Sequence, residues 1–351
     1  MPIAKLCAQS AFRPVLARAW ARVALLALPL AACQQAAPAA APSAAAPSDE
    51  PAAAAEGAAT AESSAAESST ATPAATPPGA AAAADAPRKL VIENSELVEL
   101  HSEQTGRDYQ LIVGLPESYA KEPDRRYPVL YLLDGQWDFN LINALTGGLR
   151  YDKTMPETLI VGITYAGTAP DYGKLRGEDY TPTRSHPSYA KEAYGGDGPK
   201  FLSFLEHDVL PTIEQRYRVD PTQRTLSGHS LGGLFTLYAL IEKPDLFQTY
   251  LSLSPAVGWD DRYLFGRERE FHAKHPGLNK RVWLSVGDLE WPDYVKNAKA
   301  FFAQFESSHY KGIELKVQVV AGERHAGVKP ESYNRALRFA FEPWAATQKP
   351  D

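Results

Sequence analysis

Cysteine is almost missing from the chain: its 351 residues contain only Cys7 and Cys33, both near the beginning. The rest of the sequence therefore offers no disulfide, no cysteine nucleophile and no thiolate metal site. A basic run is missing too, with a formal net charge of −6 and an isoelectric point near 5.8, so nucleic acid is not an expected partner. The sequence has no H-E-x-x-H motif and no phosphate-binding glycine loop, and His272 with His275 is too weak a pair to indicate a metal site. We therefore expect neither a metal nor an organic cofactor.

The apolar run near the beginning, residues 23–32, is too short for a stable transmembrane helix, which needs about 20 residues. Three arginines precede it, as in an export signal. The run ends in Leu30-Ala31-Ala32-Cys33, which resembles the lipobox of bacterial lipoproteins, so we expect Cys33 to be lipidated. An ordinary secretory signal is the alternative. Lipoproteins held at the inner membrane usually have an aspartate after the cysteine, whereas here it is Gln34. The resemblance therefore implies an exported, periplasm-facing protein of the outer membrane.

The composition divides the chain into three parts. Residues 1–33 form the expected signal segment, and residues 34–88 are dominated by Ala, Pro, Ser and Thr. Scattered prolines and the lack of an apolar period argue against a packed helix there, so we expect a disordered tether. The remaining stretch, residues 89–348, is long enough for one large domain with a substantial core.

Strand and helix signals alternate along this domain, which predicts an α/β fold with a mainly parallel sheet and helices on both faces. Residues 96–100 and 109–115 are expected to form an antiparallel hairpin at its start, because a polar turn joins them. Residues 165–196 form a long insertion, which we expect to cover the rim of a site. Further strands are expected at 129–133, 159–164, 249–254, 282–286 and 313–320, and helices at 201–217 (with Pro211 kinking or dividing it), 231–241, 295–305 and 333–341.

The stretch Gly228-His229-Ser230-Leu231-Gly232 has the G-x-S-x-G pattern of a serine hydrolase. A short strand signal precedes it and an apolar helical run follows it, so Ser230 is expected on a sharp strand-to-helix turn that needs glycines beside it. The backbone N–H of Leu231 would then point at a developing oxyanion, and Gln136, in the loop after the strand at 129–133, is placed to supply a second N–H. The alternative is an ordinary serine in a tight glycine turn.

In α/β-hydrolases the nucleophile is followed along the chain by an acid and then by a histidine. His325 has the expected position after a strand near the end of the chain, and we predict it as the general base. Glu290 and Asp288 both follow the strand at 282–286 and are the candidates for the acid, with Glu290 ranked first. Each carboxylate has the alternative role of a helix cap or a surface charge.

Several stretches together resemble an esterase family of the α/β-hydrolases, from about Glu96 to Ala345. The family contains ferric-siderophore esterases, feruloyl esterases, S-formylglutathione (esterase D-like) hydrolases and bacterial mycolyltransferases, and the likeness is greatest to the siderophore esterases. It implies ester hydrolysis by Ser230, with His325 as base and Glu290 in the acid position, where the wider family often has aspartate. The stretches are Tyr131-Leu132-Leu133-Asp134-Gly135, Arg176-x-x-Asp179-Tyr180-Thr181-Pro182, Gly228 to Phe235, Leu253-Ser254-Pro255 and Trp259-Asp260-Asp261.

The substrate is less constrained by the sequence. Trp137, Arg176, Tyr180 and Trp259 fall in stretches expected at the active edge of the sheet, and we take them as candidates for substrate binding. Aromatic side chains suit a catecholate or cinnamoyl acyl group and an arginine suits an anion, but loop packing and ion pairing with neighbouring acids fit as well.

Together these patterns predict a tethered serine carboxylic-ester hydrolase that acts through an acyl-enzyme on ferric catecholate siderophore esters or other aromatic esters. An acyltransferase with the same triad and a non-catalytic binding lipoprotein are the alternatives. The expected partners are a small-molecule ester and, through the lipid on Cys33, a membrane.

Overall fold

The computed structural model describes residues 91–185 and 194–348. The expected signal segment with Cys33 and the expected tether at 34–88 lie outside them. In the described part of the chain, no helix is both long enough and apolar enough to cross a membrane.

The strands are β1 (Ser95–Ser102), β2 (Arg107–Gly114), β3 (Tyr127–Leu132), β4 (Leu159–Tyr165), β5 (Val219–His229), β6 (Thr249–Leu253), β7 (Arg281–Gly287) and β8 (Glu314–Val320). The helices are α1 (Gly135–Tyr151), α2 (Tyr172–Asp179), α3 (Gly198–Phe204), the π-helical turn η1 (Leu205–Val209), α4 (Leu210–Arg216), α5 (Leu231–Glu242), the 3₁₀ turn η2 (Pro244–Leu246), α6 (Trp259–Lys274), α7 (Pro292–Ser307), α8 (Lys329–Ala340) and α9 (Glu342–Ala345).

The strands of the described residues form one sheet in the order β1-β2-β4-β3-β5-β6-β7-β8. β1 pairs antiparallel with β2, which pairs antiparallel with β4, and the other neighbouring strands are parallel. The predicted α/β fold with a mainly parallel sheet and an antiparallel hairpin at its start is therefore confirmed. Since β3, β5, β6, β7 and β8 run in the same direction, the loops that follow them lie along one edge of the sheet.

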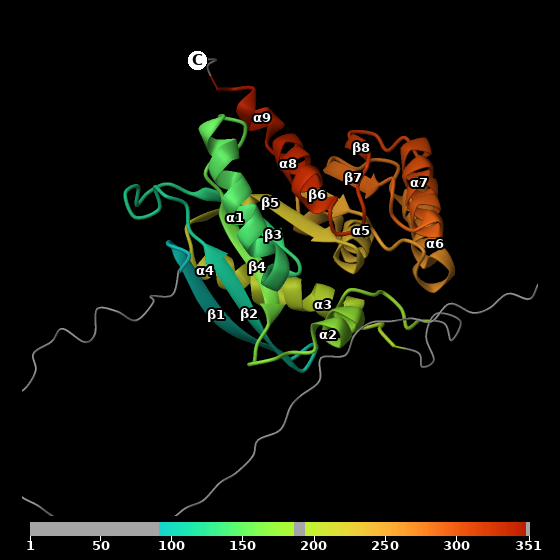
Figure 1. Ribbon diagram of the computed structural model, residues 1–351. Helices are drawn as coiled ribbons and strands as arrows, with labels where there is room; N and C mark the ends of the chain where they lie inside the picture. The colour runs from blue at the N-terminus through green and yellow to red at the C-terminus, as the bar shows by residue number, and fades with distance from the viewer. Residues whose placement is uncertain (1–90, 186–193, 349–351) are drawn as a thin grey trace, which may run out of the picture. The chain divides into compact units, whose positions relative to one another are not determined.

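Helices cover both faces of the sheet, and each face has its own apolar core. On one face α1 and α8 lie side by side against β3, β4 and β6 (Figure 1), with Phe139 and Leu337 among the buried side chains. On the other face α3, α5 and α7 bury Phe201, Phe235 and Phe301. Because both faces are covered, β3 and β4 are buried along their whole length, which is why the sequence shows them as continuous apolar runs.

The helical region predicted at 201–217, with Pro211 kinking or dividing it, is divided. α3 ends at Phe204, the π-helical turn η1 follows, and α4 begins at Leu210. Pro211 lies in the first turn of α4 and has no N–H to donate to the turn before it, which accounts for the interruption.

The sequence patterns do not predict α1 or α6. α1 follows β3 after two residues, Leu133 and Asp134, of which Asp134 has the left-handed conformation (φ 58°). The first turn of α6 also departs from a regular helix, because Asp260, Asp261 and Arg262 have φ values of 46°, 50° and 66°. Neither beginning carries the side-chain cap that marks a helix start in a sequence.

The long insertion is attached to the sheet by a partly buried ion-pair cluster. The carboxylate of Asp179, at the end of α2, accepts hydrogen bonds from Nη1 of Arg107 at 2.5 Å and from the hydroxyl of Tyr109 at 2.7 Å, both on β2. Arg107 also pairs with Glu178 and Asp197 at 2.6 and 2.8 Å. Burial raises the pKa of Asp179 to about 6, although Arg107 and Tyr109 oppose the shift. Part of the insertion expected to cover the site, residues 186–193, lies outside the described residues.

Candidate active site

Ser230 lies on the sharp turn between β5 and α5. Its φ of 60° and ψ of −117° fall outside the regions that most residues adopt. Hydrogen bonds hold the turn in place: the N–H of Ser230 donates to the carbonyl of Leu253 at 3.0 Å, and its carbonyl accepts from the N–H of Ala256 at 3.1 Å. Gly228 approaches Gly232 so closely that a Cβ on Gly228 would lie 2.4 Å from the Gly232 carbonyl oxygen. The glycines of the motif are therefore required by the close approach of strand and helix.

The structure brings Ser230, His325 and Glu290 into one chain of hydrogen bonds. Nε2 of His325 lies 2.9 Å from Oγ of Ser230, and Nδ1 of the same ring lies 2.5 Å from Oε2 of Glu290. The three residues come from the loops or turns after β5, β8 and β7, all at one edge of the sheet. The side chain of Glu290 is fully buried, whereas that of His325 is 22 % exposed. This arrangement suits transfer of a proton from the serine hydroxyl to the imidazole.

Glu290 is held as a carboxylate by its surroundings. Its Oε1 accepts hydrogen bonds from the hydroxyl of Ser254 at 2.6 Å and from the N–H of Gly287 at 2.7 Å. Burial alone would raise the pKa of Glu290, but the hydrogen bonds from His325, Ser254 and Gly287 outweigh burial and lower it below its usual value. Glu290 therefore keeps its charge while it orients the imidazole of His325.

The second candidate for the acid, Asp288, is not next to His325. Its Oδ1 accepts a hydrogen bond from the N–H of Gly322 at 2.7 Å, and its own N–H donates to the carbonyl of Val320. Asp288 is exposed and ties the turn after β7 to the loop after β8. The structure thus corrects the second-ranked expectation, because this carboxylate is used to fix the loop that contains the histidine.

His229, the residue before Ser230, forms a hydrogen bond with the backbone of His325. Its Nε2 lies 2.7 Å from the carbonyl oxygen of His325, and the two rings are 4.5 Å apart. Burial lowers the pKa of His229 well below its usual value, and the neighbouring His325 lowers it further, so the ring is neutral and Nε2–H donates to the carbonyl. No sequence pattern indicates this role, because the contact joins β5 to the loop after β8.

The two backbone groups predicted as oxyanion donors begin two neighbouring helices. Leu231 is the first residue of α5, and Gln136 is the second residue of α1. The loop before α1 touches the first turn of α5, since a Cβ on Gly232 would lie 3.4 Å from Oδ2 of Asp134. Among the described residues, neither N–H donates to a protein acceptor. Both are first-turn N–H groups, which bind anionic oxygens well.

Arg176 and Tyr180, expected to contact substrate, instead hold this loop in place. Nε and Nη2 of Arg176 donate to the two carboxylate oxygens of Asp134 at 2.9 and 2.8 Å. The N–H of Asp134 donates to the hydroxyl of Tyr180 at 3.2 Å, and the side chain of Tyr180 is only 1 % exposed. A paired arginine and a buried tyrosine cannot form an open binding surface. The structure therefore corrects both expectations, because Arg176 and Tyr180 are bound to Asp134, in the turn that leads into α1 and Gln136.

A further buried contact joins the first turns of α1 and α8. Asp138, two residues after Gln136, accepts hydrogen bonds from Nζ of Lys329 and from the hydroxyl of Tyr333, each at 2.7 Å. Lys329 is the first residue of α8, four residues after His325. The beginning of α1 and the beginning of α8 are thus fastened together, which fixes the separation of the histidine and the candidate oxyanion donor.

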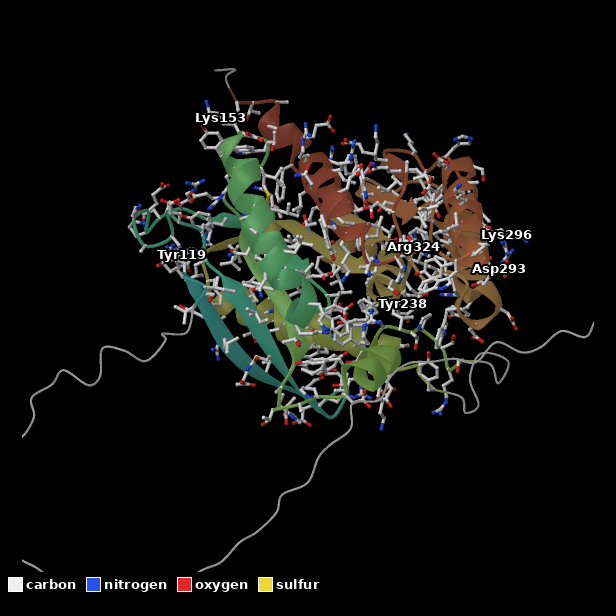
Figure 2. The ribbon with its side chains drawn as sticks, in the orientation of Figure 1. Tyr119, Lys153, Tyr238, Asp293, Lys296 and Arg324 are labelled. Atoms are coloured by element: carbon white, nitrogen blue, oxygen red, sulfur yellow. The ribbon has the colours of Figure 1, made fainter. Side chains whose placement is uncertain are left out.

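Two aromatic side chains after Glu290 enclose the imidazole of His325. The rings of Trp291 and Tyr294 each lie 5.0 Å from the ring of His325, at interplanar angles of 54° and 79°. The hydroxyl of Tyr294 donates to the carbonyl of Ser254 at 2.5 Å, and burial raises its pKa, so it stays protonated. Trp291 is 61 % exposed and covers the histidine from solvent. Asp293, in the first turn of α7, is exposed and projects away from the sheet (Figure 2).

The other two candidates for substrate binding lie in different environments. Trp137 is 50 % exposed, with its ring edge-on to Tyr172 at 5.8 Å, and it stays available to a ligand. Trp259 is only 8 % exposed, its indole N–H donates to the carbonyl of Thr183 at 3.0 Å, and its ring contacts Tyr194. The structure therefore corrects the expectation for Trp259, which packs α6 against the insertion.

Within the described residues, no group of three or more His, Cys, Asp and Glu side chains is placed to hold a metal ion. The chemistry of the site can be carried by Ser230, His325, Glu290 and backbone N–H groups.

Comparison with known proteins identifies the family. A family model described as Putative esterase matches residues 102–335. The chain belongs to this esterase family. Ferri-bacillibactin esterase BesA of Bacillus subtilis (strain 168) is 30% identical over 269 residues, which cover 72% of this chain and 91% of the relative. The esterase is therefore a carboxylic ester hydrolase, and the resemblance seen in the sequence is confirmed.

Solved structures agree with this membership. The BES protein from Bacillus cereus is 28% identical with a TM-score of 0.66, and the match covers 73% of the esterase and 97% of that chain. An IroE-like serine hydrolase from Shewanella oneidensis is 26% identical with a TM-score of 0.64, covering 71% of the esterase and 80% of that chain. Both matches place the esterase in the α/β-hydrolase fold.

Proposed function

We propose that Ser230 is the nucleophile of the esterase and that hydrolysis proceeds through an acyl-enzyme. Oγ of Ser230 attacks the ester carbonyl carbon while its proton passes to Nε2 of His325. The negative charge that develops on the carbonyl oxygen is stabilised by the N–H groups of Leu231 and Gln136. When the tetrahedral intermediate collapses, the C–O bond to the alcohol breaks and the alcohol takes the proton from His325.

Water then hydrolyses the acyl-enzyme by the same steps. It attacks the acyl carbon, gives one proton to His325 and, as the intermediate collapses, the acid leaves and Ser230 recovers its proton. Glu290 stays ionised throughout, holds Nδ1–H of His325 and stabilises the imidazolium. The observation that carries this proposal is the uninterrupted line of hydrogen bonds from Ser230 through His325 to Glu290.

We propose a siderophore ester as the substrate. The support is the function of the relatives, since BesA is a ferri-bacillibactin esterase and a relative from Emericella nidulans is a siderophore enterobactin esterase. The exposed rings of Trp137 and Trp291 add an aromatic rim of the kind that packs against aromatic acyl groups.

The location of the esterase is a separate proposal. The lipobox-like Leu30-Ala31-Ala32-Cys33 supports lipidation of Cys33 and attachment to the outer membrane on the periplasmic side. Metabolic labelling with a radioactive fatty acid is expected to label the full chain, and Cys33→Ala is expected to abolish the label. Unchanged labelling of the variant would contradict the proposal.

The experiment that tests the function compares Ser230→Ala with Ser307→Ala, which changes an exposed serine at the end of α7. Each protein is given p-nitrophenyl butyrate, ferri-bacillibactin and methyl ferulate. Ser230→Ala is expected to lose hydrolysis of all three esters and labelling by a fluorophosphonate, whereas Ser307→Ala keeps both. Equal activity of the two variants would refute the nucleophile. Faster hydrolysis of methyl ferulate than of ferri-bacillibactin would refute the siderophore assignment but leave the triad standing.

A further inference from the structure

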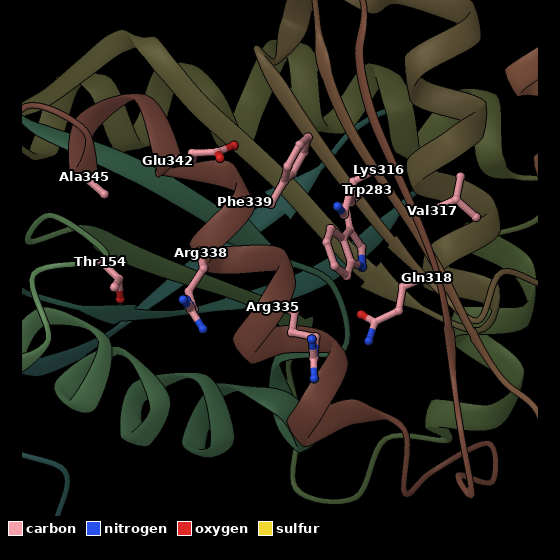
Figure 3. A pocket seen from close by; sticks show the side chains of 10 residues that line it. All are labelled: Thr154, Trp283, Lys316, Val317, Gln318, Arg335, Arg338, Phe339, Glu342 and Ala345. Carbon is pink, nitrogen blue, oxygen red and sulfur yellow. The ribbon is translucent and has the colours of Figure 1, made fainter.

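A groove of about 500 Å³ lies on the sheet between β8 and α8, away from the triad. Figure 3 shows its floor and walls: Trp283 from β7, Lys316 and Gln318 from β8, and Arg335, Arg338 and Phe339 from α8. Its volume is in the range of small-molecule sites, roughly 300–1,000 Å³. None of the residues of the proposed triad lines it, and neither do the candidate oxyanion donors Leu231 and Gln136.

Two residues that line this groove, Trp283 and Gln318, have buried polar atoms without a protein partner, and so do two nearby serines that do not line it. Among the described residues, the indole nitrogen of Trp283, Oε1 of Gln318 and the hydroxyls of Ser285 and Ser332 have no hydrogen-bond partner in the protein. Trp283 is 3 % exposed, and both serines are fully buried. In Figure 3 the indole nitrogen of Trp283 is on the side of Gln318.

These four residues are neighbours in the fold. Ser285 is paired in register with Gln318, and Trp283 with Lys316, so alternate residues of β7 and β8 face α8 together. Ser332 is one helical turn before Arg335 on α8. Folded proteins leave few buried polar groups unpaired. The two that belong to lining residues, Nε1 of Trp283 and Oε1 of Gln318, indicate that the groove is suited to a polar ligand group.

The rim of the groove is cationic. Lys316, Arg335 and Arg338 stand around it, and the one carboxylate in the lining, Glu342, pairs with Arg281 at 3.0 Å. Arg335 pairs with Glu331 at 2.9 Å, but within the described part of the chain Lys316 and Arg338 have no ion-pair partner. Two uncompensated cations beside an indole N–H donor favour an anionic group.

The floor of the groove is aromatic. The rings of Trp283 and Phe339 lie 5.8 Å apart at an angle of 47°, and the guanidinium of Arg281 lies 4.4 Å from the ring of Phe339. An aromatic surface packs against the apolar or planar part of a ligand, and the cations at the rim pair with a negative charge on that ligand. We propose that this groove is a second binding site, separate from the triad, for a small aromatic carboxylate.

The proposal is tested by calorimetric titration of the full chain with salicylate. Salicylamide serves as the neutral analogue and sulfate as an anion without an aromatic body. Salicylate is expected to bind at about one equivalent, salicylamide at least about tenfold more weakly, and sulfate without displacing salicylate. Sulfate that displaces salicylate fully would overturn the requirement for an aromatic body.

Two variants with the same charge change locate the binding. Arg338→Glu reverses a cation at the rim of the groove, whereas Lys299→Glu reverses an exposed cation on α7. Arg338→Glu is expected to weaken salicylate binding about tenfold or more, and Lys299→Glu to leave it unchanged. Trp283→Phe, which keeps the aromatic floor but removes the N–H donor, is expected to weaken it as well. Equal affinities of Arg338→Glu and Lys299→Glu would overturn the site.

The same titration is made after Ser230 has been blocked with a fluorophosphonate. Binding is expected to persist, because the groove contains no residue of the triad. Loss of binding on this treatment would show that salicylate occupies the active site and would overturn the proposal. None of these titrations measures hydrolysis, so their outcome does not test the proposed catalytic function, which the Ser230→Ala experiment tests independently.

Discussion

Nε2 of His229 donates a hydrogen bond to the backbone carbonyl of His325 at 2.7 Å. The residue before the proposed nucleophile thus fixes the backbone of the proposed base, across the sheet edge from β5 to the loop after β8. Because buried His229 is neutral, it can donate without placing a second positive charge beside the imidazolium that forms during catalysis.

Replacing His229 tests this support. His229→Phe keeps an aromatic ring but leaves the carbonyl of His325 without its donor, so we expect kcat to fall by roughly 10- to 100-fold and the free energy of unfolding by about 1–3 kcal/mol. His229→Gln, with an amide donor, is expected to recover part of both. Steady-state hydrolysis of p-nitrophenyl butyrate and urea unfolding measure the two effects. Identical kcat values for wild type and His229→Phe would show that the hydrogen bond does not position His325.

The identity of the acid is tested by two variants, each of which replaces a carboxylate with the amide of the same length. Glu290→Gln removes the charge that stabilises the imidazolium and is expected to lower kcat by about 10²- to 10⁴-fold. Asp288→Asn keeps an oxygen that can accept from Gly322 and is expected to retain kcat within about threefold, since Asp288 does not contact His325. A greater loss in Asp288→Asn than in Glu290→Gln would reverse the assignment.

The lowered pKa of Glu290 predicts how stability depends on pH. A carboxyl group whose pKa is lower in the folded than in the unfolded protein stabilises the fold above the unfolded value of 4.5, and this contribution disappears as the pH falls through the folded value. Wild type is therefore expected to lose more free energy of unfolding than Glu290→Gln when the pH falls from about 5 to about 3. Urea unfolding of both proteins at several pH values gives the comparison. Parallel losses in the two proteins would contradict the lowered pKa.

Arg176 is expected to act on the reaction through Asp134. Arg176→Lys keeps a positive charge but loses the bidentate geometry, so the turn before α1, which leads to Gln136, is held less firmly. We therefore expect kcat to fall about tenfold or more with KM little changed. Arg107→Lys is the control, because it loosens the ion pairs of the same insertion without touching Asp134. An equal fall of kcat in both variants would show that the insertion as a whole matters rather than this contact.

The exposed ring of Trp137 is expected to contact the acyl group of the substrate. Trp137→Ala should lower kcat/KM for p-nitrophenyl benzoate by about 3- to 10-fold more than for p-nitrophenyl acetate, since only the first offers an aromatic acyl group to stack against. Tyr151→Ala, which removes an exposed ring at the other end of α1, should change neither value. The same loss for both esters would place Trp137 outside the acyl-binding surface.

Much of the fold follows from local patterns. β3 and β4 were predictable because strands buried on both faces are continuous apolar runs, and the interruption near Pro211 was predictable because proline has no N–H to donate. α1 and α6 were not, because left-handed dihedral angles occur at the residue before α1 and in the first turn of α6, and neither helix has a side-chain cap. No local signal therefore marks where they begin.

For the site, the serine in its glycine turn and the order of Ser230, Glu290 and His325 along the chain were visible in the sequence, because the turn and the connection order are local properties of the motif. Long-range contacts decided the rest. Only the folded sheet edge places Glu290 rather than Asp288 beside His325 and turns Arg176 and Tyr180 toward Asp134, because each side chain takes the partner that neighbouring loops bring within hydrogen-bond distance. Burial then removes the water that would otherwise form hydrogen bonds with these side chains. Each buried polar group therefore keeps the protein partner that the fold brings to it.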